Sequence, residues 1–336
     1  MRYTKPHLTL DQQVERLSGR GLQVGDTAKA RRVLEAVGYY RFSAYAYPFR
    51  VPIPPSGARD TTVQYRTDAF VANARFEWAE DLYSFDRALR LLILDAVETI
   101  EIALRSKIGY HLGAGDPFGH LSRDHLDAAK CDRPDAVDRT RTSYDTWRER
   151  FSAHLLSSSS EDFISHHIQK YDGRLPIWAA TEIMEFGQLV RLFGFMRDAD
   201  QSRVSKDLAG VSGAVFVRWM KTANYARNIS AHHARLWNRT LTYKLGRVPE
   251  TAPDLIHLNA QAHSRSRTYA VCALLAFLTQ RVRSETGWIV AAARCDGRIP
   301  GSASGDTGDA HGLSRRVADS RPVGRSLSLS ARPHPV

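Results

Sequence analysis

The densest polar chemistry of this 336-residue chain lies in residues 221–239, which hold three arginines, three asparagines and two adjacent histidines. An arginine offers a fixed fork of hydrogen-bond donors that suits a phosphate, and a histidine can give or take a proton near neutral pH. Arg227 and His232 are therefore candidate catalytic residues for cutting RNA without a metal, and Asn228 is the candidate that positions the histidine or the phosphate. Further RNA-binding candidates in the same segment are His233, Arg235, Asn238 and Arg239.

The spacing of the two catalytic candidates requires a special backbone. On an unbroken helix, residues five apart are displaced by roughly 140° and do not share a face, whereas Asn228 and His232 are four apart and do. We expect a helix end or a bend near Ser230 to bring Arg227 onto the same side. The alternative is that the arginines are solvated or ion-paired and that the histidines are hydrogen-bonded groups buried beside Trp237.

The elements that must position these residues are helices, and the clearest helical pattern runs over residues 76–111, where large apolar residues recur every three or four positions. Glu98, Glu101 and Arg105 form a polar stripe on this predicted helix. Glu101 and Arg105 are correctly ordered for an intrahelical ion pair, which is the expected use. Alternatively, one of the carboxylates reaches the catalytic candidates across the helix packing and fixes their orientation.

A second arginine–histidine pair, Arg105 and His111, lies at the end of the same predicted helix. Gly109 and Tyr110, which stand between them, indicate a helix end rather than a site. We therefore expect the chemistry to lie in residues 221–239 and not here.

Further helices are predicted in much of the remaining sequence, and the stretch from residue 56 to Asp68 is predicted to be a loop that includes a short extended piece. Thr9 and Asp26 are expected helix caps. Apolar periodicity predicts further helices over residues 10–18, 27–37, 145–156, 162–171, 178–184, 189–195 and 266–282, and one that leads from residue 214 into the catalytic segment. The first two helices form a hairpin that permits a DNA-binding helix-turn-helix, although such hairpins are more often plain packing units.

Residues 38–50 interleave Arg41 and Arg50 with six aromatic residues. Aromatic rings can stack on unpaired bases while arginines hold the backbone, so Arg41 is a candidate RNA contact. For most of these rings the alternative is packing around the first helices, with one or two left exposed.

The composition of the chain indicates which kinds of partner and cofactor it can bind. A formal net charge of +11 favours a polyanion, because phosphates attract a basic surface. Three widely separated cysteines indicate neither a disulfide framework nor a zinc site, and His166 and His167 lack a carboxylate at ligand spacing, so we expect no metal and no other cofactor.

The sequence shows no common targeting motif, nucleotide-binding loop or hydrolase motif. No signal peptide is recognisable and no apolar run approaches the roughly 20 residues of a membrane span, so we expect a cytoplasmic protein without a membrane partner. The sequence contains neither a Walker-type loop nor a Gly-x-Ser-x-Gly elbow, which disfavours ATP-driven and common hydrolase functions.

Several motifs occur together and in a fixed order, namely Lys5-Pro-His-Leu-Thr-Leu, Gly38-Tyr-Tyr-Arg-Phe-Ser-Ala-Tyr, Leu82-Tyr-Ser-Phe-Asp-Arg-Ala-Leu-Arg90, Leu175-Pro-Ile-Trp178 and Arg227-Asn-Ile-Ser-Ala-His-His-Ala-Arg-Leu-Trp-Asn-Arg239. In this combination the chain, from residue 5 to about residue 290, resembles the Abi-like abortive-infection family of bacterial phage-defence proteins, of the AbiD/AbiF type. That family resembles the HEPN ribonucleases, whose signature is an arginine and a histidine separated by four to six residues, often with asparagine directly after the arginine. Arg227, Asn228 and His232 match this signature.

The resemblance implies an all-helical, HEPN-like bundle and a metal-independent endoribonuclease toxin that leaves a 2′,3′-cyclic phosphate on RNA. One signature per chain implies a homodimer that completes the site, and a small-RNA or protein antitoxin is a further partner to test for. The alternative function is a non-catalytic RNA-binding or sensing module that arrests growth by sequestering RNA.

The expected organisation has three parts. Residues 1–55 form an N-terminal helical and aromatic-basic segment packed on the core, and residues 56–293 form the HEPN-like helical domain. Residues 294–336 form a disordered tail, because the composition there shifts to Gly, Ser, Asp, Arg and Pro.

Overall fold

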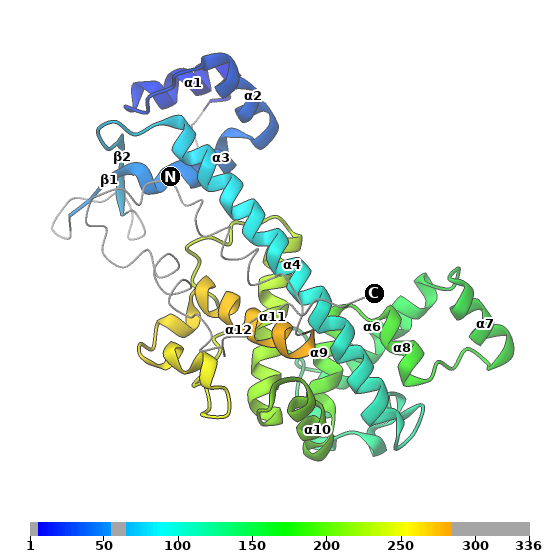
Figure 1. Ribbon diagram of the computed structural model, residues 1–336. Coiled ribbons are helices and arrows are strands. Elements are labelled where there is room, and N and C mark those ends of the chain that lie inside the picture. Colours follow the sequence, from blue (N-terminus) through cyan, green and yellow to red (C-terminus); the bar gives the residue numbers. More distant parts are fainter. Residues whose placement is uncertain (1–5, 55–64, 284–336) are drawn as a thin grey trace, which may run out of the picture.

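The computed structural model describes residues 6–54 and 65–283 and is all-α apart from one small antiparallel sheet (Figure 1). The all-α prediction is therefore confirmed. The predicted disordered tail lies outside the described residues.

The N-terminal part is a group of short helices followed by the sheet. Its elements are α1 (Leu10–Gly19), α2 (Thr27–Val37), α3 (Tyr39–Ala46), the 3-10 helix η1 (Tyr47–Phe49), β1 (Arg50–Pro52) and β2 (Arg66–Phe70). The predicted caps are present: the Thr9 side chain accepts from the amide of Gln12 in a capping box, and the Asp26 side chain accepts from the amide of Lys29. Of the aromatic residues in this part, Tyr40 is 91% exposed, whereas Phe42 and Tyr45 are buried.

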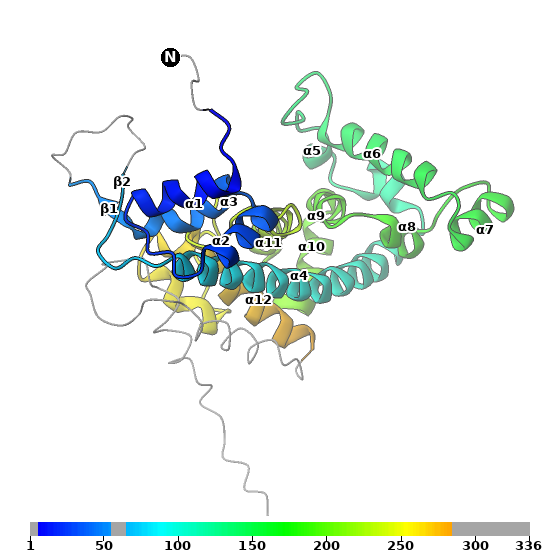
Figure 2. The same ribbon diagram turned by 90° about the horizontal axis from the view of Figure 1, so that it is seen from above.

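The central element is α4 (Phe76–Gly113), which crosses the molecule from the N-terminal helices to α8 (Figure 1). The apolar residues that predicted this helix are buried in the core, and α3, α8, α10, α11 and α12 pack against it. Seen from above, α1–α3 lie near one end of α4, while α6, α7 and α8 lie near the other (Figure 2).

The second half of the chain supplies the helices that surround α4. They are the 3-10 helices η2 (Gly119–Leu121) and η3 (Arg123–His125), then α5 (Ala128–Cys131), α6 (Ser143–Ser157), α7 (Asp162–Lys170), α8 (Ile177–Ile183), α9 (Phe186–Phe195), α10 (Asp198–Ala209), α11 (Gly213–Ala231), η4 (Pro253–Asn259), η5 (Ser264–Ser266) and α12 (Thr268–Val282). None of the helices in residues 6–54 and 65–283 is long and apolar enough to cross a membrane.

The long helix predicted over residues 76–111 is confirmed and ends two residues later, at Gly113. Gly109 lets α8 approach, because a Cβ at this position would lie 3.3 Å from the Cα of Trp178. The Nε2 of His111, in the last turn of the helix, lies 3.1 Å from the Oδ2 of Asp207.

Candidate functional site

The catalytic candidates lie at the carboxyl end of α11. The helix ends at Ala231, next to the Ser230 position where an end was predicted, and His232 caps it with φ −86° and ψ 12°. The amide of His232 still donates to the carbonyl of Asn228 at 3.0 Å, as in a regular helix. The backbone therefore does not bend between Arg227 and His232, and the helix end does not by itself bring the two residues onto one face.

The residue after the cap is held in an unusual conformation. His233 has a left-handed backbone with φ 57°. Its amide donates to the carbonyl of Ser230 at 3.1 Å, and the amide of Ala234 donates to the carbonyl of Ile229 at 3.0 Å, which are the two hydrogen bonds of a Schellman motif. Glycine is the common residue at this position, since other residues pay roughly 1 to 2 kcal/mol for this backbone. A histidine thus occupies a position that backbone energetics favour for glycine.

The side chain of Arg227 links the two polar stripes of α11. Its Nη1 donates to the Oδ1 of Asn228 at 3.1 Å, and both residues are half-buried. Asn228 lies one helical turn before His232, whose exposed ring makes no hydrogen bond or ion pair within the described part of the chain. The guanidinium therefore reaches the stripe that carries His232 by a side-chain contact rather than by a bend in the backbone.

Arg227 also faces the polar stripe of α4. Burial raises the pKa of the Glu101 carboxyl, and the positive charges of Arg105 and Arg227 oppose that rise. The predicted ion pair is confirmed, with the Nη2 of Arg105 2.6 Å from the Oε1 of Glu101, and the same nitrogen donates to the carbonyl of Met184 at 3.0 Å. The charge of Arg227 thus acts to lower the pKa of Glu101, whose hydrogen-bonded partner is Arg105, while Glu98 is exposed.

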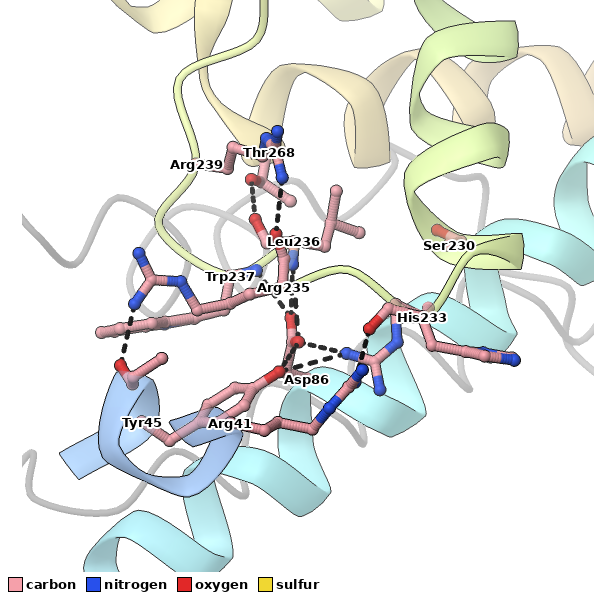
Figure 3. A network of polar contacts seen from close by, with 12 residues as sticks. Arg41, Tyr45, Asp86, Ser230, His233, Arg235, Leu236, Trp237, Arg239 and Thr268 are labelled. Atoms are coloured by element: carbon pink, nitrogen blue, oxygen red, sulfur yellow. Dashed lines mark hydrogen bonds and ion pairs between the residues drawn. The ribbon is translucent and has the colours of Figure 1, made fainter. Parts of the chain in front are cut away.

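A buried carboxylate on α4 holds the segment that follows His233 (Figure 3). Asp86 is fully buried and accepts hydrogen bonds from the amides of Leu236 at 3.1 Å and Trp237 at 2.6 Å, and from the hydroxyl of Tyr45 at 2.6 Å. It also forms an ion pair with Arg90, whose side chain is 6% exposed. Because a buried charge needs such partners, the loop at residues 236–237 and Asp86 stabilise each other.

Two arginines tie the same loop to α3. The Nη1 of Arg41 donates to the carbonyl of His233 at 2.6 Å, and the Nη1 of Arg235 donates to the carbonyl of Ala44 at 2.8 Å (Figure 3). The contacts run in opposite directions and join α3 to a loop about 190 residues later in the sequence. Each guanidinium carries five N–H donors, so both arginines retain donors for an anion.

The other candidates from residues 221–239 are arranged along the loop. Arg239 is half-buried, and its Nη1 donates to the carbonyl of Arg235 at 3.3 Å. Asn238 is exposed and has a left-handed backbone with φ 51°. Among the described residues, no group of three His, Cys, Asp or Glu side chains is arranged to hold a metal.

The structure groups the candidates in two sets. One set consists of two hydrogen-bonded pairs, Arg227 with Asn228 on α11 and Arg105 with Glu101 on α4, and the charge of Arg227 acts on Glu101. The other is the loop of His233, Arg235, Asn238 and Arg239 together with Arg41 of α3. His232 stands between the sets, at the point where α11 gives way to the loop.

Sequence reasoning missed Asp86, Arg90 and Tyr45. A signal for two of them was present, because Asp86 and Arg90 are four residues apart and fall on the apolar side of α4, among Leu82, Phe85 and Leu89. Charged residues on the core side of a helix indicate a buried ion pair. Tyr45 carried no comparable signal among its aromatic neighbours.

Comparison with known proteins gives one match. Residues 32–238, which run from the second half of α2 through α11 and the loop as far as Asn238, match the model of a family described as Abi-like protein. No curated protein and no solved structure matches the chain.

Proposed function

The chain belongs to the Abi-like family, and on that premise we propose that it is a metal-independent endoribonuclease that acts in abortive infection. The family points to a role in bacterial defence against phage. The finer function, RNA cleavage at Arg227 and His232, is proposed from the chemistry of the residues at the end of α11.

The observation that carries this proposal is the exposed His232 at the helix cap, one turn beyond an asparagine that binds the guanidinium of Arg227. An imidazole that is exposed and free of internal hydrogen bonds can exchange protons with a bound substrate. A guanidinium held nearby by an asparagine supplies positive charge and donors for a phosphate. The net charge of +11 supports a polyanionic substrate.

In the proposed reaction, His232 takes the proton from a ribose 2′-hydroxyl, whose oxygen attacks the adjacent phosphorus. The P–O5′ bond breaks, and the leaving 5′-oxygen is protonated by His232 of a second copy, so that a 2′,3′-cyclic phosphate remains. Arg227 stabilises the charge that develops on the phosphoryl oxygens, a role worth about 3 kcal/mol or roughly a hundredfold in rate. Asn228 accepts a hydrogen bond from the guanidinium and fixes it, and the carboxylate of Glu101 on α4, which is paired with Arg105, attracts it electrostatically.

The test is whether the purified protein cleaves RNA in the presence of EDTA and leaves 2′,3′-cyclic phosphate ends. We expect His232→Ala to lower the cleavage rate by roughly 10² to 10⁴, because it removes the general base, while RNA affinity is largely kept. The matched control is His263→Ala, which removes an exposed histidine outside the site and should cleave like the parent.

Two results would contradict the proposal. One is a His232→Ala protein that cleaves RNA as fast as the parent. The other is a parent protein that binds RNA without cleaving it and loses affinity evenly as each arginine of the segment is removed, which is the behaviour of a non-catalytic RNA-binding module.

A further inference from the structure

The exposed side of α4 forms a continuous surface to which no role has been assigned above. Residues spaced three and four apart along it are Tyr83, Arg87, Leu91, Leu94, Glu98 and Ile102, which we call the α4 face. Arg87, Leu91, Glu98 and Ile102 are exposed, whereas Leu94 and Tyr83 are half-buried, and the Tyr83 ring packs edge to face against Tyr45. At roughly 100° per residue they fall within an arc of about 100° on the helix. Leu91 is 51% exposed and Ile102 is 53% exposed, and one long edge of α4 has no helix or strand beside it in Figure 1.

The two charged residues of the α4 face lack partners. Arg87 and Glu98 are both exposed, and neither forms an ion pair or a side-chain hydrogen bond within residues 6–54 and 65–283. Most charged side chains on a protein surface are exposed, so exposure by itself does not indicate an interface. The indication comes from where Arg87 and Glu98 lie relative to the apolar residues of the α4 face.

The α4 face is complementary to itself. A twofold axis that crosses α4 midway between Leu91 and Leu94 pairs two such helices antiparallel. It places Leu91 opposite Leu94 of the second copy, Arg87 opposite Glu98, and Tyr83 opposite Ile102. Both copies therefore contribute the same contacts, with apolar residues at the centre and opposite charges on either side, as an isologous interface requires.

We propose that the α4 face is an interface between two copies of this chain, paired antiparallel about this axis. A different partner would not need a surface that matches itself in both charge and apolar contacts. Glu101 lies at the border of the same arc and is under the electrostatic influence of Arg227, and α11 packs against α4, so the proposed catalytic segment of each copy is on a helix next to the interface. The use of this dimer to complete a shared site rests on the proposed function, whereas the pairing itself does not.

The experiment is charge reversal followed by sedimentation velocity. The full-length parent is expected to sediment as a dimer. Arg87→Glu and Glu98→Arg should each weaken dimerisation roughly tenfold or more, because each change places two like-charged pairs across the twofold axis. The matched controls are Arg32→Glu and Glu15→Arg, which reverse exposed charges on α2 and α1 and should leave the dimer unchanged.

The distinguishing step is to mix the two variants. A 1:1 mixture of the Arg87→Glu and Glu98→Arg proteins should recover the dimer, because each copy then meets an opposite charge at both positions. The double variant should also dimerise alone. No other surface and no local misfolding predicts recovery on mixing.

Three results would overturn the pairing: a monomeric parent, single variants that dimerise like the parent, or variants that fail to recover on mixing. None of these measurements involves RNA. A failed interface is therefore distinguishable from a failed nuclease, which the His232→Ala assay tests separately.

Discussion

His233 has a strained, left-handed backbone at a position where glycine is the common residue. His233 holds the left-handed position of a Schellman motif, where glycine costs least. Arg41 donates to its carbonyl at 2.6 Å and thereby fixes the strained turn. A strained, exposed residue next to the catalytic candidate indicates that the side chain matters more for function than for stability.

Most substitutions lower the free energy of unfolding, but a glycine at position 233 is expected to raise it. His233→Gly should raise the free energy of unfolding by about 1 kcal/mol, because glycine relieves the left-handed strain, and should weaken RNA binding because an RNA-binding candidate is lost. Chemical denaturation and an RNA titration measure the two effects.

The control for this prediction is His263→Gly. His263 is also exposed but has an ordinary right-handed backbone with φ −74°, so glycine there should lower stability by roughly 0.5 to 1 kcal/mol. Equal losses in the two variants would show that the conformation of His233 carries no strain.

Among the helices, α4 supplies the buried charge, Asp86, that holds the loop at residues 236–237. Asp86→Ala would leave Arg90 buried without its ion partner and the amides of residues 236 and 237 without their acceptor. We expect a loss of about 3 to 5 kcal/mol in the free energy of unfolding, measured by chemical denaturation. Asp81→Ala, at an exposed position on the same helix, should change it by less than about 0.5 kcal/mol. A similarly small change for Asp86→Ala would show that the loop is held by other contacts.

The helices were predictable because their signals are local. Apolar spacing marked α4, and the side chains of Thr9 and Asp26 marked the starts of α1 and α2. The role of Gly109 was ambiguous because a glycine inside a helical pattern can mean either a nearby helix end or a close contact. Only the position of Trp178, about seventy residues later in the chain, distinguishes the two meanings.

The candidate site was predictable in its residue types but not in its assembly. The pairing of Glu101 with Arg105 follows from spacing on one helix. The contacts of Arg41 with His233 and of Asp86 with the loop join distant segments, and no local pattern encodes which backbone group a side chain will find. The contact of Arg227 with Asn228 depends on a rotamer, which spacing on a helical wheel does not specify.

For the molecule as a whole, a buried histidine couples folding to pH. His120 is fully buried, neither ring nitrogen has a hydrogen bond within the described residues, and its ring meets Phe151 edge to face. Burial, and then the positive charge of Arg148, lower its pKa from 6.5 to about 3. Between these values the unfolded chain binds a proton that the folded chain does not.

The folded state should therefore lose stability as the pH falls below about 6.5, with this residue contributing a slope of up to about 1.4 kcal/mol per pH unit. His120→Phe should flatten the dependence, whereas His263→Phe at an exposed position should leave it unchanged. Chemical denaturation between pH 7 and pH 4 measures the slopes. An unchanged slope in His120→Phe would mean that other groups govern the acid sensitivity.

Asp86 and Glu101 stand on one uninterrupted helix; Asp86 accepts hydrogen bonds from the loop at residues 236–237, and Glu101 is under the electrostatic influence of Arg227. One residue added or removed between them would turn Glu101 by roughly 100° relative to Asp86 and shift it by about 1.5 Å. The number of residues in this stretch therefore fixes how the two carboxylates are oriented toward residues 227–237. Insertions and deletions among relatives should accumulate in the connections on either side of α4 and be absent from this interval.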